Sequence, residues 1–141
     1  MIRTIDSNVS VAPQILPEQM PEIAAAGFVA IVNNRPDDEE PGQPSGAAIQ
    51  AAAEAAGLAY TAIPVTHAGF GHDQLGAMRA ALDAADGPVL AYCRSGTRSC
   101  NLWALAEAKA GGDPAELVGK AQGAGYDLSG IRPTLDALSG R

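Results

Sequence analysis

Residues 17–33, PEQMPEIAAAGFVAIVN, predict the unit from which the fold is built. The first ten of these residues place apolar side chains at helical spacing, and Gly27 follows as the residue type preferred just past a helix end. The next run, residues 28–33, is short, apolar and partly β-branched, as in a buried strand. We therefore expect a helix over residues 17–26, a glycine stop and a strand.

The same order of elements returns twice along the chain. Residues 45–56 predict a second helix, Gly57 its end, and residues 59–64 (AYTAIP) a second buried strand. A third helix is expected to begin with Asp73 as its N-cap, and a strand over residues 89–92 follows it. Strands that alternate with helices are joined in parallel through right-handed crossovers.

The fold class that follows is a three-layer α/β domain with a mostly parallel central sheet of about four strands, flanked by helices. Residues 9–12 supply a short early strand, which we place at an edge of the sheet. After the last strand the pattern is helical, with helices expected over residues 99–110, after a cap at Asp113, and over residues 131–138. We expect residues 1–141 to form one domain with a helical C-terminal third.

Composition and charge restrict the class of protein. The chain has 141 residues, 47% of them hydrophobic, and its net charge of −7 argues against a general nucleic-acid binder or a protein of anionic membrane surfaces. No apolar run approaches the roughly 18 residues of a membrane span, and the first residues lack the features of a secretion signal. We expect a cytoplasmic protein without a nucleic-acid or membrane partner.

The cysteines and histidines exclude two kinds of structural support. Cys93 and Cys100 are too few for a disulfide-stapled scaffold, and together with His67 and His72 they complete no zinc-binding spacing. Neither a metal nor another cofactor is expected. In a reducing compartment a cysteine of this chain is available for reaction.

Three loops are expected to meet at the carboxyl edge of the sheet, where ligands bind in open parallel sheets. They are residues 33–45, 65–72 and 93–98. Part of the first, residues 35–45 (RPDDEEPGQPS), carries four adjacent acids that would repel one another in a packed element. We interpret it as a solvated surface loop that favours solubility, in preference to a binding site.

The segment of residues 88–99, PVLAYCRSGTRS, carries the candidate chemistry. It places Cys93 where a buried strand ends, before a short loop and a helix N-terminus, and Arg94 and Arg98 add two positive charges. Such surroundings stabilise a thiolate, so we expect Cys93 to be a nucleophile at neutral pH. A buried structural cysteine is the alternative, but it leaves the flanking residues unexplained.

The other residues of this segment have expected roles as well. Gly96 suits a tight loop that needs a positive φ or the close approach of a ligand, and Ser99 is expected to cap the helix, with or without a hydrogen bond to the thiolate. Cys100 is interpreted as a packing residue, with a resolving thiol for an oxidised Cys93 as the alternative. The residues expected to bind an anion are Arg94, Ser95, Gly96 and Thr97.

Two resemblances follow from these residues. The string CRSGTRS at residues 93–99 resembles the active loop of single-domain rhodaneses, which carry a persulfide on the loop cysteine. Over roughly residues 1–110 the chain resembles the phosphatase-like domain of the beta-lactamase hydrolase-like proteins. The motifs that carry this second resemblance are VSVAPQ (9–14), NNRPD (33–37), QPS (43–45), IPV (63–65) and LAYCRSGTRSxxLWA (90–104). It implies a fold similar to dual-specificity tyrosine phosphatases, and some family members are described as sulfur transferases.

The chain departs from the tyrosine phosphatase pattern at two points. That pattern has a histidine before the cysteine and five residues between the cysteine and an arginine, whereas Tyr92 precedes Cys93 here and four residues separate Cys93 from Arg98. A smaller ring suits a persulfide sulfur better than a phosphoryl group. The loop of residues 65–72 also lacks the aspartate that serves as general acid. The candidates to replace it are His67, Asp73 and Asp37.

Three functions are compatible with these observations. The one favoured from sequence is a sulfurtransferase, in which Cys93 accepts a sulfane sulfur and passes it to a thiol or cyanide. The alternative is a phosphatase that forms a phosphocysteine, with Arg98 holding the phosphoryl oxygens and Ser99 assisting the thiolate as a leaving group. The third is a non-catalytic module that binds anions or senses oxidation. In each case the ligand is a small anion.

Overall fold

The central sheet has five strands in the order β1-β2-β5-β3-β4. The computed structural model describes residues 1–140, and in it β2, β5, β3 and β4 run parallel, while β1 pairs with β2 in the antiparallel sense. The strands are β1 (Arg3–Thr4), β2 (Val9–Ala12), β3 (Ala30–Asn33), β4 (Ala59–Ala62) and β5 (Val89–Tyr92).

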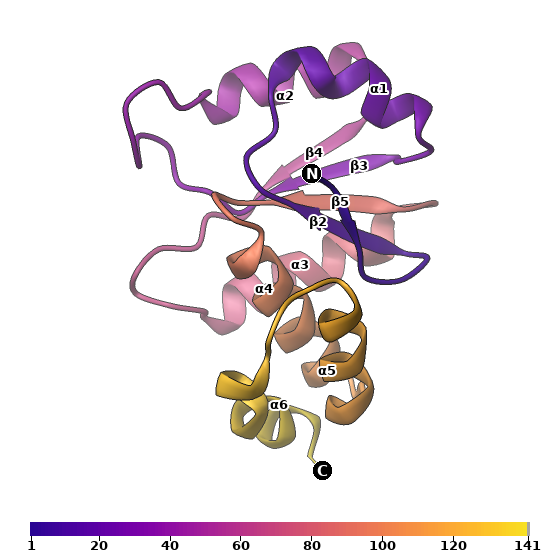
Figure 1. Ribbon diagram of the computed structural model, residues 1–141, viewed down its shortest axis with the longest axis vertical. Helices are drawn as coiled ribbons and strands as arrows, with labels where there is room; N and C mark the ends of the chain where they lie inside the picture. Colours follow the sequence, from indigo (N-terminus) through magenta and orange to yellow (C-terminus); the bar gives the residue numbers. More distant parts are fainter. Residues whose placement is uncertain (141) are drawn as a thin grey trace.

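Helices cover both faces of the sheet and confirm the three-layer prediction. Figure 1 shows α1 and α2 on one face and the remaining α-helices on the other, where α5 and α6 pack against α4. The C-terminal third is helical, as predicted. The helices are η1 (Pro17–Gln19), α1 (Met20–Ala25), α2 (Gly46–Ala55), α3 (His72–Ala84), α4 (Thr97–Lys109), α5 (Pro114–Gly123), η2 (Ser129–Ile131) and α6 (Arg132–Ser139).

Two strand predictions were wrong about position in the sheet. β2 is not an edge strand: it lies between β1 and β5, and all four of its residues are buried. The two-residue β1 folds back along its outer side and covers the edge. β4, predicted to be buried, is itself the opposite edge, and three of its four residues are exposed because it has a neighbouring strand on one side only.

Side chains cap two of the helices, and the cap predicted at Asp113 is confirmed. The Ser45 hydroxyl accepts a hydrogen bond from the Ala48 amide at the start of α2, and Asp113 accepts one from the Ala115 amide at the start of α5. The prediction for α3 was wrong, because Asp73 lies inside the first turn. Gly71 is the N-cap there, and its amide donates to the side chain of Gln74 at 2.6 Å, which takes the place of a capping carboxylate.

The alternation of side chains along β5 divides the core into two parts. Leu90 and Tyr92 pack beneath α1 and α2, whereas Val89 and Ala91 pack with residues of α3 and α4, including the buried Trp103. Both Tyr92 and Trp103 are buried core residues. β5 is therefore buried on both faces, and the chain emerges from this rigid strand directly into Cys93.

Neither a membrane span nor a metal cluster is found in the described part of the chain. Its longest helices have 13 residues, and none is long and apolar enough to cross a membrane. Over residues 1–140 no group of three or more histidine, cysteine or acidic side chains is arranged to hold a metal ion. The cellular location of the protein stays a prediction.

Candidate active site

Cys93 lies at the end of β5, where a short turn leads into α4. We call residues 93–99 the active loop. Cys93 is fully buried, and its Sγ accepts a hydrogen bond from the Gly96 backbone N–H at 3.1 Å. Gly96 is also the N-cap of the 13-residue helix α4. The sulfur therefore sits where a backbone donor and the positive end of a helix both favour negative charge.

Gly96 has the backbone conformation expected from the sequence. Its φ is +91°, in the left-handed region that favours glycine, and a Cβ at this position would collide with the hydroxyl of Tyr126. The residue thus combines the turn with close approach of a neighbouring side chain. Replacement by any other residue type would move the N–H that faces Cys93.

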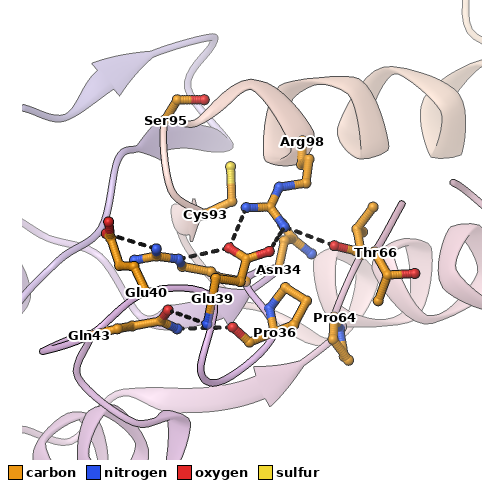
Figure 2. Close-up of polar contacts among 12 residues, drawn as sticks. Asn34, Pro36, Glu39, Glu40, Gln43, Pro64, Thr66, Cys93, Ser95 and Arg98 are labelled. Carbon is orange, nitrogen blue, oxygen red and sulfur yellow. Dashed lines mark hydrogen bonds and ion pairs between the residues drawn. The ribbon is translucent and has the colours of Figure 1, made fainter. Parts of the chain in front are cut away.

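Arg98 lies in the first turn of α4 and reaches across the carboxyl edge of the sheet. Its Nη1 and Nη2 donate to the two carboxylate oxygens of Glu39 at 2.7 and 2.8 Å, and Nη1 also donates to the Val65 carbonyl at 2.9 Å (Figure 2). A guanidinium has five N–H donors. Glu39 and Val65 do not contact the Nε–H or the second N–H of Nη2. These two donors lie on the same edge of the guanidinium and form a fork suited to an oxyanion.

The charge of Arg98 is coupled to Cys93 as well as to Glu39. The hydrogen bond to Glu39 raises the pKa of Arg98, and interaction with Cys93 acts in the same direction. Figure 2 shows the guanidinium extending from α4 over the region between Cys93 and Glu39. Arg98 is therefore part of the site that the sequence predicted.

Glu39 is the site residue that the sequence analysis misjudged. It lies in residues 35–45, which we call the acidic loop, and besides Arg98 it accepts a hydrogen bond from Nε of Arg35 at 2.9 Å. The hydrogen bond from Arg98 lowers the pKa of Glu39 to about 2, with Arg35 adding to the effect against the opposing influence of burial. The expectation that these acids only solvate the surface was wrong.

Arg35, the first residue of the acidic loop, holds two acids of the same loop in place. Its guanidinium is buried, with a side chain 1% exposed, and it donates to Glu39, to Glu40 at 2.9 Å and to Gln14 at 3.1 Å. A buried cation needs such partners, because an unpaired charge away from water is costly. One signal for this pairing was present in the sequence, since Arg35 and Glu39 stand four residues apart.

Asn34 joins the loops that surround the site. Its backbone N–H donates to the Tyr92 carbonyl at 2.8 Å, its carbonyl accepts from the Val65 amide at 3.0 Å, and its side chain donates to the Ile63 carbonyl at 2.9 Å. These bonds connect the ends of β5, β3 and β4. The three predicted loops therefore meet, as the parallel sheet requires.

The polar residues early in the active loop face outward. The side chain of Arg94 is 64% exposed and contacts Glu40 at 3.5 Å, while the hydroxyls of Ser95 and Thr97 bond to each other at 3.0 Å. The anion-binding roles predicted for these three side chains stay predictions. The group of the active loop that points at the Cys93 sulfur is the backbone N–H of Gly96.

Ser99 and Cys100 are both buried in the first turns of α4. Ser99 is not a helix cap, because Gly96 already occupies that position. Its Oγ is one of two buried side-chain nitrogen or oxygen atoms in residues 1–140 without a hydrogen-bond partner. Burial, with a smaller effect of Cys93, raises the pKa of the Cys100 thiol to about 12. Cys100 therefore packs as a neutral thiol, and its resolving role stays a prediction.

The three candidates for a general acid lie in two loops and in the first turn of α3. Asp37 accepts a hydrogen bond from the Gly46 amide at 2.8 Å at the start of α2. Asp73 is exposed in the first turn of α3, and His67 is exposed in the loop before it. Among the polar contacts of the described residues, none links these three side chains to the active loop, so their roles stay predictions.

Comparisons with known proteins agree with this architecture. The family model described as "Beta-lactamase hydrolase-like protein, phosphatase-like domain" matches residues 1–110. A beta-lactamase hydrolase-like protein of Agrobacterium fabrum is 39% identical over 104 residues, which cover 74% of this chain and 24% of the relative. The chain spans only 24 to 30% of the length of the curated relatives it matches.

Solved structures share the fold. A Neisseria meningitidis protein described as a "putative phosphatase" has a TM-score of 0.84 and 36% identity, with 97% of each chain covered. TpbA of Pseudomonas aeruginosa, solved in complex with pTyr, has a TM-score of 0.67 at 15% identity, with 98% of this chain and 87% of TpbA covered. The latter likeness shows the fold alone. Together with other phosphatases of the same kind, these structures confirm the tyrosine phosphatase-like fold predicted from the sequence.

Proposed function

The chain belongs to the family of the phosphatase-like domain of beta-lactamase hydrolase-like proteins, and we propose that it is a cysteine-dependent phosphatase with Cys93 as its nucleophile. One observation carries the proposal: Cys93 Sγ lies just before α4 with the Gly96 N–H directed at it, and Arg98, whose charge interacts with Cys93, is held beside it by Glu39. The 36% identical chain described as a "putative phosphatase", with 97% of each chain covered, supports it.

The reaction that this geometry supports has two steps. The Cys93 thiolate attacks phosphorus, the bond from phosphorus to the ester oxygen breaks, and the released alcohol takes up a proton. Water then attacks the phosphocysteine, which frees inorganic phosphate and restores the thiolate. Backbone N–H groups of the active loop and the Arg98 donors that Glu39 and Val65 do not take up stabilise the phosphoryl oxygens, where negative charge is concentrated. Ser99 Oγ, without a partner, is available to stabilise the departing thiolate.

Aryl phosphates are the substrate class that suits this site best. A phenol is a better leaving group than an alkyl alcohol and needs less help from a general acid, and no acid is yet placed at Cys93. The pTyr complex of TpbA supports the same class at the level of the fold. We further propose that residues 1–141 act as one domain, because α5 and α6 pack against α4, which begins in the active loop.

Sulfur transfer remains as a second candidate on one observation. Only four residues separate Cys93 from Arg98, which is the spacing that resembles rhodaneses. The comparisons favour the phosphatase and give sulfur transfer no support, so the preference drawn from the sequence is reversed. A non-catalytic module remains as an outcome of the test.

The test is a paired assay of the reduced protein. Para-nitrophenyl phosphate is supplied in one reaction and thiosulfate with cyanide in the other, and wild type is compared with Cys93→Ser and with the control Cys100→Ala. We expect phosphate release that falls at least about a thousandfold in Cys93→Ser, as when other enzymes lose their nucleophile, and that persists in Cys100→Ala. Thiocyanate without phosphate release would favour the sulfurtransferase, and silence in both would favour the binding module.

A further inference from the structure

Tyr126 contacts the active loop from the segment between α5 and η2, beyond the 110 residues that the family model matches. Its hydroxyl donates a hydrogen bond to the Ser95 carbonyl at 3.2 Å. The same hydroxyl lies against Gly96, where it occupies the space that a Cβ would need. The contact thus falls on the peptide bond between Ser95 and Gly96.

That peptide bond also carries the donor to the nucleophile. The Ser95 carbonyl and the Gly96 N–H belong to one planar unit, and in a trans peptide they point in opposite directions. The carbonyl points to Tyr126, so the N–H points to Cys93 Sγ, 3.1 Å away. Because glycine permits many backbone conformations, a contact from outside the loop restricts this plane to one orientation.

Tyr126 is itself held in place by its surroundings. Its backbone N–H donates to the Ala121 carbonyl at 2.9 Å, at the end of α5. The guanidinium of Arg3 lies 5.9 Å from the ring centroid, and its Nη1 donates to the Ala124 carbonyl at 3.1 Å. Burial raises the pKa of the Tyr126 hydroxyl, so it keeps the proton that it donates.

We propose that Tyr126 is a positioning residue for the active site: its hydrogen bond to the Ser95 carbonyl keeps the Gly96 N–H directed at Cys93 Sγ and at the anion that binds there. The role of Tyr126 in orienting the Gly96 N–H toward Cys93 Sγ follows from the geometry. Only the expected effect on phosphate esters rests on the proposed function. The segment between α5 and η2, which carries Tyr126, is thereby part of the active site.

The experiment compares Tyr126→Phe with the wild type and with Tyr60→Phe. Tyr60 is the matched control because it also carries a hydrogen-bonded hydroxyl, which accepts from the Asn33 side chain at 3.0 Å on the edge strand β4. The first measurement is the rate at which iodoacetamide alkylates Cys93, mapped by mass spectrometry across a range of pH. The second is the set of kcat and KM values for para-nitrophenyl phosphate and the inhibition by inorganic phosphate.

We expect Tyr126→Phe to shift the alkylation profile toward higher pH and to slow alkylation at mildly acidic pH by about three- to tenfold, which corresponds to the loss of one hydrogen bond to the site. Inhibition by inorganic phosphate should weaken to a similar degree, while the thermal melting curve stays close to that of the wild type. Tyr60→Phe should leave the alkylation profile unchanged.

Equal alkylation profiles in Tyr126→Phe and the wild type would overturn the inference, whatever the phosphatase activity. A shift of the same size in Tyr60→Phe would also overturn it, because a general effect of lost hydroxyls would then explain the result. If the wild type hydrolyses no phosphate ester, the proposed function fails, whereas the alkylation comparison still decides the role of Tyr126.

Discussion

The active loop and the acidic loop meet at Arg98 but use its charge differently. The active loop directs the Gly96 N–H at Cys93 and begins α4, whose first turn carries Arg98. The acidic loop supplies Glu39, which takes up both terminal nitrogens of the same guanidinium and is braced by the buried Arg35. The acidic loop thus holds the Arg98 guanidinium in place, and the active loop presents it to the anion. This division explains how an acidic protein maintains a cationic site.

The largest effect is expected from removal of the residue that both loops share. Arg98→Ala should lower kcat/KM for an aryl phosphate by about 100- to 1,000-fold, since it removes donors aimed at developing charge. Arg98→Lys should recover only part of this loss, because lysine keeps the charge without the two-donor edge. Steady-state kinetics of both variants measure the loss of kcat/KM. A loss below tenfold in Arg98→Ala would mean that backbone donors alone hold the anion.

A smaller effect, on stability, is expected from neutralising Glu39, which holds Arg98 in place. Glu39→Gln should reduce the free energy of unfolding at neutral pH by about 1–2 kcal/mol, since charge-assisted hydrogen bonds to Arg98 and Arg35 are weakened. Asp38→Asn is the matched control, because it neutralises the adjacent carboxylate and asparagine tolerates the φ of +62° at that position. Urea titrations of the three proteins measure the difference.

The same variant has a defined pH dependence. The pKa of Glu39 is lowered from 4.5 to about 2 in the folded protein, so its contribution is complete above pH 4.5 and is lost as the pH falls toward 2. The gap in unfolding free energy between wild type and Glu39→Gln should therefore close across this interval. A gap that stays constant down to pH 3 would show that the charge of Glu39 is not its source.

The smallest effect is expected at Arg94. Its exposed side chain contacts Glu40 at 3.5 Å, and exposed ion pairs contribute about 0–1 kcal/mol. Arg94→Ala should change kcat/KM for an aryl phosphate by less than about twofold, on the same reasoning. A substantially larger loss would restore Arg94 to the anion-binding role that its position in the sequence suggested and would show that its side chain turns inward when an anion binds.

Much of the fold followed from local patterns. The strand over residues 89–92 and the cap at Asp113 were predicted correctly, because strand propensity and capping depend on neighbours along the chain. The positions of β2 and β4 in the sheet were not, because the sequence does not show which strand lies beside which. Asp73 was misjudged because the helix begins before it, at His72, with Gly71 as the N-cap and the Gly71 amide donating to the Gln74 side chain.

The site divides along the same line. By itself, the sequence determined the setting of the proposed nucleophile: Cys93 at a strand end, Gly96 in the turn and Arg98 in the next helix lie within six residues of one another, and local geometry places them. Only the tertiary structure decided that Glu39, 59 residues from Arg98, holds the guanidinium and that Tyr126, 31 residues from Ser95, orients the peptide facing the sulfur. The physical reason is that charge pairing and peptide orientation depend on groups brought together by packing, and separation along the chain does not record such contacts.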